Sequence, residues 1–130
     1  GDSSTPVFAS MDIHAKMLMV DNRYMNVGSC NKNNRGLLLE GELDVAVLDD
    51  AFVKTAKQRV LGLATGRPGT DWTRSGAIIF AELKALASAN QTKMNEATES
   101  GQPLETEPEG FLYPLDFGDE YLLDVGPDMF

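Results

Sequence analysis

The sequence predicts a mixed α/β fold, an α+β sandwich in which helices flank a β-sheet. Two observations predict it: short apolar runs lie between turn residues near the start of the chain, and longer runs with helical spacing follow them. At 130 residues the chain has room for one compact domain with a single core. We therefore expect residues 1–66 to form the central lobe. Residues 67–130 should add a helix, an acidic loop and an aromatic tail that pack on the same lobe.

The first strands are predicted from composition and turn signals. Residues 13–20 are rich in Met, Leu, Ile and Val and end at the turn signal of residues 21–23, which predicts a buried strand. Residues 24–27 should form a second strand in a tight hairpin, and Gly28 should end it. Residues 29–36 are dense in Asn and Gly, so we expect a loop or a short helical turn there.

A third strand and a helix follow. Residues 42–48 alternate between acidic and apolar side chains before an apolar run, which predicts a strand. Asp49 or Asp50 would then cap a helix over residues 51–64, because an aspartate oxygen can accept hydrogen bonds from free N–H groups of the first turn. Gly66 would end that helix.

The second half is less regular. Apolar residues at helical spacing predict a helix over residues 75–97. Residues 96–110 hold five Glu, two Pro and two Gly and should form a solvated acidic loop. Residues 111–130 concentrate aromatic side chains, which we expect to pack on the core as an extended tail, the alternative being a lid over a nearby site. Residues 1–10 are small and polar and should form an arm.

Composition and charge exclude several classes of function. Eleven Lys and Arg against twenty Asp and Glu give a net charge of −9, which would repel a nucleic acid. One Cys cannot form an internal disulfide, and one His with one Cys does not make a zinc site, so we expect neither a metal nor another cofactor. No apolar run approaches the roughly 20 residues that span a bilayer.

One motif stands far above this background. His14 and Lys16 are followed by Asp21 and then by residues 28–31, giving H-x-K-x4-D-x6-G-S-x-N, a pattern expected by chance roughly once in a million chains of this size. Side chains two apart in a strand face the same way, so His14 and Lys16 should point together. An imidazole can act as nucleophile or acid near neutral pH, and a lysine places positive charge at a phosphate oxygen. Asp21 has the opposite parity, which places it outside the phosphate pocket, where it would orient the strand end or pair with a base.

Three further residues complete the candidate site. Ser29 and Asn31 share parity in the loop, so their hydroxyl and amide can donate to phosphate oxygens or hold the neighbouring loop. If the third strand lies beside the first, a carboxylate at Glu42 can accept a hydrogen bond from the far ring nitrogen of His14 and fix its tautomer. Cys30 should be buried rather than reactive, because nothing near it in sequence favours the thiolate.

The motif resembles that of the phospholipase D superfamily, whose members carry this HKD motif and cleave or exchange phosphodiesters. The likeness continues through residues 34–36 and 42–47, which are similar to the segment after the second HKD motif of bacterial phospholipases D. The resemblance implies a phospholipase D-like half-domain in which Lys16 and Asn31 bind the phosphate. It also implies that an acidic residue holds the histidine, a role that we assign to Glu42 rather than to Glu40 or Asp44.

The resemblance also implies a partner. In the family one HKD histidine attacks phosphorus to give a phosphohistidine, and a second protonates the leaving alcohol and then activates water or an acceptor alcohol. This sequence holds one histidine, so the second motif must come from another copy or from a different polypeptide. Because only 13 residues precede His14, we expect the C-terminal part of a two-motif enzyme. The chain carrying the first motif would then complete the sheet and the site, with His14 as general acid and base.

The negative charge favours a small phosphodiester headgroup, such as that of a phospholipid, over a nucleic acid. A homodimeric nuclease of the same superfamily and a noncatalytic binding or structural subunit are the alternatives. Peripheral membrane contact would need exposed apolar residues; residues 37–39, three leucines, are the candidate, although we expect them to pack in the core. We expect a soluble protein, with secretion or a periplasmic location left open and any targeting signal outside this sequence.

Overall fold

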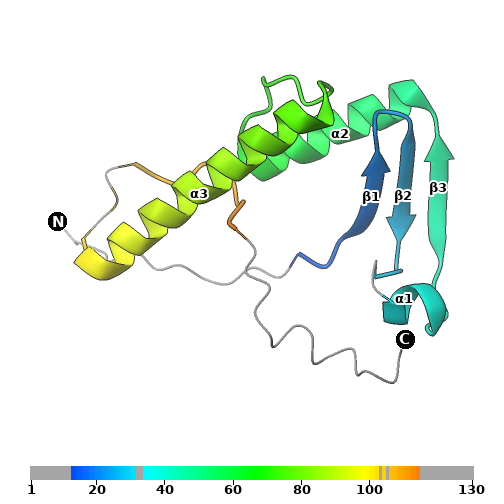
Figure 1. Ribbon diagram of the computed structural model, residues 1–130, viewed down its shortest axis with the longest axis horizontal. Coiled ribbons are helices and arrows are strands. Elements are labelled where there is room, and N and C mark those ends of the chain that lie inside the picture. Colours follow the sequence, from blue (N-terminus) through cyan, green and yellow to red (C-terminus); the bar gives the residue numbers. More distant parts are fainter. Residues whose placement is uncertain (1–12, 32–33, 103, 105, 115–130) are drawn as a thin grey trace. The chain divides into compact units, whose positions relative to one another are not determined.

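The computed structural model describes residues 13–31, 34–102, 104 and 106–114, apart from the side chains of residues 34 and 35. Its elements (Figure 1) are β1 (Lys16–Val20), β2 (Tyr24–Gly28), α1 (Asn34–Leu38), β3 (Asp44–Leu48), α2 (Asp50–Thr65) and α3 (Gly76–Ser100). The described residues fall into two compact units, which we call the sheet unit (residues 13–54) and the helical unit (residues 55–114). The mixed α+β class predicted from the sequence is confirmed.

The sheet is an antiparallel meander in the order β1-β2-β3. Lys16 pairs with Gly28, and Gly28 pairs in turn with Asp44. Asp21 sits in the first hairpin turn with φ 54°, a left-handed conformation that aspartate tolerates better than most residues. All three predicted strands form. The third strand lies beside the second and not beside the first, so the arrangement that would carry Glu42 directly to His14 does not occur.

The strands are less buried than the sequence predicts. On one face of the sheet Leu18 and Val20 are 44% and 46% exposed, and on the other Val27 and Val45 are exposed as well. The prediction that residues 13–20 form a buried strand is therefore wrong. The core packing expected for the leucines of residues 37–39 is also wrong, because all three are more than half exposed. In both cases the apolar run shows only that the segment could be buried. Burial also requires another part of the structure to pack against it.

Helix α2 begins and ends within one residue of the predicted bounds 51–64. The side chain of Asp49 caps it, with the Phe52 N–H donating to Oδ1 at 2.8 Å. Gly66 ends it with φ 70°. Gly66 has a second reason to be glycine, because a Cβ there would lie 2.9 Å from the backbone nitrogen of Gly110. A Cβ on Gly110 would lie 2.2 Å from the carbonyl oxygen of Ala64, so the returning chain crosses α2 backbone against backbone.

Helix α3 is longer than the predicted 75–97. It ends at Gly101, whose left-handed conformation lets its N–H donate to the carbonyl of Ala97 at 3.0 Å. The predicted acidic loop of residues 96–110 is thus wrong for its first five residues, which are helical, because the sequence has no helix-breaking residue before Gly101. Of the predicted aromatic tail the structure describes residues 111–114. The remainder of the tail and the polar arm of residues 1–10 lie outside the described residues.

The helical unit closes around two side chains that the sequence analysis did not single out. Trp72 is fully buried, and its indole N–H donates to the carbonyl of Arg67 at 3.0 Å. Asn90 is 1% exposed, and its amide nitrogen donates to the carbonyls of Glu109 and Leu112 at 2.8 and 3.0 Å. The Glu109 N–H donates back to Asn90 Oδ1 at 3.0 Å. Asn90 therefore binds the end of the acidic loop and the residues that follow it to α3.

Candidate functional site

The first half of the motif lies where β1 begins. His14 stands two residues ahead of the strand with an exposed side chain, and Lys16 is the first strand residue and is half-buried. Lys16 Nζ donates to the backbone carbonyl of His14 at 3.3 Å. The two residues have the same parity along the chain, and this contact holds the ammonium close to the residue that carries the imidazole. The exposed imidazole is accessible from solvent, and an ammonium at the neighbouring strand position can attract an anionic substrate.

The register of the sheet brings the second half of the motif to the same end. Lys16 pairs with Gly28, so the loop that begins at Ser29 starts next to Lys16 on the neighbouring strand. Asp21 lies at the other end of β1. It is about 16 Å from Lys16 along the strand if each residue advances roughly 3.3 Å. Its role stays a prediction.

Ser29 joins the loop after β2 to the segment that leads into β3. Its backbone N–H donates to the carbonyl of Leu43 at 3.1 Å, and its hydroxyl oxygen accepts from the Leu43 N–H at 3.1 Å. The hydroxyl donates to the carboxylate of Glu42. In the structure Glu42 thus bonds to Ser29 and makes no hydrogen bond to His14, so the expected contact between Glu42 and the imidazole stays a prediction.

Asp44, which the sequence analysis set aside in favour of Glu42, has a structural part in the site. Its Oδ1 accepts from the backbone N–H of Cys30 at 3.1 Å. The same oxygen lies 2.1 Å from where a Cβ on Gly28 would be, so only glycine leaves room for it. Lys16, Gly28 and Asp44 form one row across the sheet. This role follows from the strand register, which the sequence pattern alone does not determine.

Asn31 is exposed, and its backbone is held from two sides. Its carbonyl oxygen accepts from the thiol of Cys30 at 3.4 Å, and a Cβ on Gly36 of α1 would lie 2.3 Å from the same oxygen. Cys30 is 7% exposed, as predicted. The glycine of α1 therefore lets the helix approach the loop closely and leaves the amide side chain of Asn31 facing solvent.

The described residues hold no group of three or more His, Cys, Asp or Glu arranged to bind a metal ion. Across the same residues no helix combines the length and apolar character needed to cross a bilayer.

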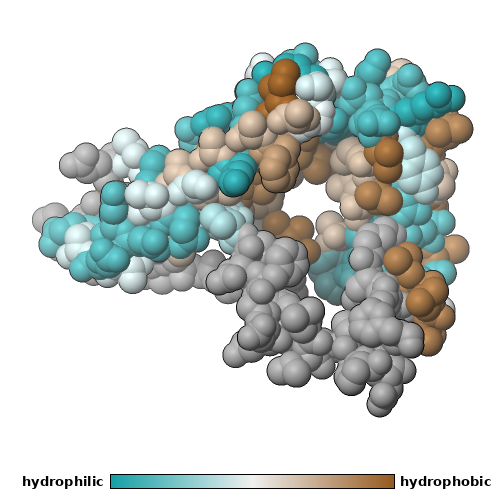
Figure 2. Space-filling view, viewed as in Figure 1, coloured by the Kyte–Doolittle hydropathy of each residue, from teal (hydrophilic) through white to brown (hydrophobic). Residues whose placement is uncertain are grey.

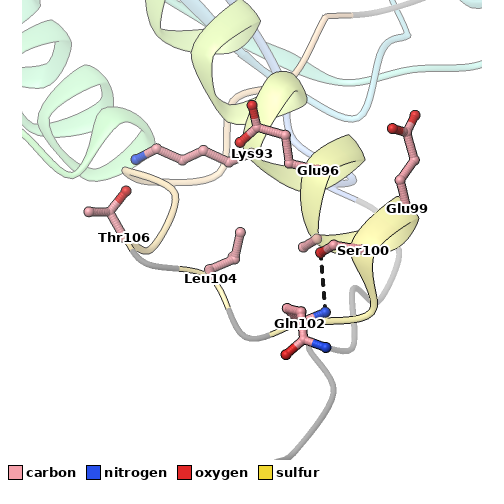
Figure 3. Close-up of a pocket in the computed structure, with 8 residues that line it drawn as sticks. Lys93, Glu96, Glu99, Ser100, Gln102, Leu104 and Thr106 are labelled. Atoms are coloured by element: carbon pink, nitrogen blue, oxygen red, sulfur yellow. Dashed lines mark hydrogen bonds between the residues drawn. The ribbon is translucent and has the colours of Figure 1, made fainter.

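One open depression belongs to the helical unit and not to the motif. It lies at the end of α3 (Figure 3) and is lined by charged and polar side chains that include Lys93, Glu96 and Glu99. Lys93 Nζ donates to the backbone carbonyl of Glu107 at 2.9 Å, so this ammonium already has a partner. None of the predicted site residues lines the depression.

Comparison with known proteins agrees with the position of the motif. The sequence model of the family described as "Cardiolipin synthase, PLD-like domain" matches residues 2–62, a segment that contains all six predicted site residues. No curated protein and no solved structure matches the chain significantly.

Proposed function

Because residues 2–62 belong to the phospholipase D superfamily of phosphodiesterases, we propose that the chain supplies half the active site of a phospholipase D-type enzyme acting on a phospholipid headgroup. The observation that carries the proposal is the pairing of Lys16 with Gly28. It places the residues that follow His14 beside the loop of Ser29 and Asn31. A nucleophile or acid, a cation and a neutral hydrogen-bond donor thus come to one end of the sheet.

In the proposed reaction one histidine attacks phosphorus, forming a P–N bond as the P–O bond to the leaving alcohol breaks. A second histidine protonates that alcohol and then removes a proton from water or from an acceptor alcohol, whose oxygen displaces the first imidazole. Attack and departure occur on opposite sides of phosphorus, so one imidazole cannot do both. We assign the acid and base role to His14. The ammonium of Lys16 and the amide of Asn31 would bind the phosphate oxygens.

The second histidine is proposed to come from a partner polypeptide that carries the first HKD motif, namely the N-terminal part of the same enzyme. The sequence of this chain holds one histidine, which supports the need for a partner. The exposed apolar side chains on both faces of the sheet, such as Leu18 and Val45, also support it, because a second polypeptide would bury them.

The proposed substrate class is supported by charge. With a net charge of −9 the chain offers no general attraction to a long polyanion, whereas a single phosphodiester in a lipid headgroup needs only the local cation Lys16. The alternative, a nuclease of the same superfamily, is an outcome of the following test.

The test uses the complex of this chain with its partner polypeptide, assayed on phosphatidylcholine in mixed micelles and on double-stranded DNA. We expect lipid turnover, and a loss of about 10²–10⁴-fold in kcat/KM for His14→Ala, the size of a general acid–base contribution. Lys16→Ala should also lose activity, and Lys84→Ala, an exposed lysine of α3, should not. Cleavage of DNA without lipid turnover would show a nuclease. Full activity of His14→Ala would show a noncatalytic subunit.

A further inference from the structure

Four leucines at one end of the sheet unit face solvent. Leu37, Leu38, Leu39 and Leu43, which we call the leucine patch, are 60%, 73%, 61% and 79% exposed. Figure 2 shows hydrophobic atoms gathered at the end of the sheet that carries α1. Large apolar side chains grouped on a surface usually mark a place where another apolar phase covers them.

The leucine patch is fixed to the loop of the candidate site at both ends. Leu43 exchanges two hydrogen bonds of 3.1 Å with Ser29, one through its N–H and one through its carbonyl. Gly36, which precedes Leu37 directly, lies against the backbone of Asn31. A surface that covers the leucines would therefore meet the Ser29–Asn31 loop at the same time.

The arrangement of the leucines fits a fluid phase better than a rigid protein face. Successive helical residues are about 100° apart around the helix axis, so Leu37 and Leu38 point to different sides of α1, and Leu39 follows in the turn after the helix. A flat protein surface would cover one side of such a turn. Lipid chains can surround all of it, and leucine side chains gain free energy on entering them.

The local charge identifies the kind of lipid. The segment from residue 29 to residue 43 contains two basic residues, Lys32 and Arg35, and two acidic ones, Glu40 and Glu42, so its net charge is 2 − 2 = 0. The whole chain carries −9 and would be repelled by an anionic surface. A neutral apolar segment on an acidic protein is suited to a zwitterionic surface.

We propose that the leucine patch inserts into the surface of a zwitterionic phospholipid layer and holds the candidate site at the level of the headgroups. The proposal rests on the proposed function for its substrate. Binding to the layer and turnover of a headgroup are nevertheless separate measurements, so either can fail alone.

The experiment measures co-sedimentation of the complex with phosphatidylcholine vesicles, and hydrolysis of a short-chain phosphatidylcholine kept below its micelle concentration. The variant Leu37→Ser/Leu38→Ser/Leu39→Ser should lose at least about tenfold in vesicle partition, because three buried leucines are removed, and should keep its activity on the monomeric substrate. Leu38→Ser has a matched control in Leu63→Ser, since both leucines are 73% exposed and Leu63 lies in the helical unit. Only Leu38→Ser should weaken partition. Phosphatidylglycerol vesicles should bind less than phosphatidylcholine vesicles.

Unchanged vesicle partition of the triple variant would overturn the proposal, and so would stronger binding to phosphatidylglycerol that does not depend on the leucines. Failure of the triple variant to assemble with its partner polypeptide, with loss of activity on the monomeric substrate, would assign the patch to a subunit interface instead. Leucine-dependent vesicle binding by a complex that cleaves no lipid would support the patch and contradict the proposed function.

Discussion

In the helical unit the side chains of Trp72 and Asn90 are almost completely buried, whereas in the sheet unit Leu18, Val20 and Val45 are between 44% and 60% exposed. The chemistry is distributed the opposite way, because every predicted site residue lies in the sheet unit. The helical unit has a closed core and no motif, and the sheet unit has a motif and few buried side chains. The comparison teaches that a strong functional motif does not require a well-buried local core, provided that hydrogen bonds such as those of Ser29 and Asp44 fix its loops.

The largest expected effect of a substitution on stability is at Trp72. Trp72→Ala should lower the free energy of unfolding by about 3–5 kcal/mol, because it leaves a large cavity and removes the hydrogen bond from the indole to Arg67. Denaturant unfolding followed by circular dichroism measures the change. The control Phe80→Ala removes an aromatic ring that is 68% exposed and should change stability by less than about 0.5 kcal/mol. Equal effects of the two substitutions would break the contrast between the units.

A smaller effect is expected at Gly28. A Cβ there would lie 2.1 Å from Asp44 Oδ1 and 2.3 Å from the carbonyl of Leu43, so Gly28→Ala must push β2 and β3 apart at a cost of about 1–3 kcal/mol. Gly41→Ala is the control, because nothing lies within 4 Å of its Cβ position. Hydrogen exchange should show faster exchange in the sheet unit alone. Equal loss of protection around Trp72 would mean that the two units unfold together.

Ser29→Ala should lower stability by about 0.5–1.5 kcal/mol, the usual contribution of a hydrogen bond. The hydroxyl bonds to Glu42 and to the N–H of Leu43, so a double-mutant cycle with Glu42→Ala should show coupling between the two side chains. Ser29→Thr, which keeps the hydroxyl, is the control. A rise in KM with no change in stability and no coupling to Glu42 would instead assign Ser29 to the phosphate.

The smallest effect concerns pH and the helical unit. The Arg67 guanidinium donates a hydrogen bond to Glu109 and holds the pKa of that carboxyl below its ordinary value. The folded protein therefore favours the carboxylate, and this stabilisation is complete above the ordinary carboxyl pKa of about 4.3 and is lost as the pH falls through the lowered pKa of the folded state. The stability difference between wild type and Glu109→Gln should be small, because both side chains are part exposed, and should shrink on acidification. If the stability curves of wild type and Glu109→Gln stayed parallel from pH 7 to pH 3, this prediction would be contradicted.

Much of the secondary structure could be predicted because its signals are local. The hairpin turn at residues 21–23, the cap at Asp49 and the end of α2 at Gly66 depend on side chains and backbone angles a few residues apart. The motif spacing likewise identified His14 and Lys16 before any contact was known. Long-range pairing was not predictable in this way. The third strand could have been expected beside the first, and the structure pairs it with the second instead.

By itself the sequence determined the class of fold, most of the element boundaries and the motif, because each follows from local conformational preference or from residue types at fixed spacing. Only the tertiary structure decided which groups meet. It paired β3 with β2, set Asp44 against Gly28, bound Glu42 to Ser29 and buried Asn90 between α3 and the segment near Glu109. These contacts join residues 13 to 24 positions apart, and the chain reaches them only when whole elements pack. An apolar run is buried where another element packs against it. Without such packing its side chains face solvent, as they do in the leucine patch.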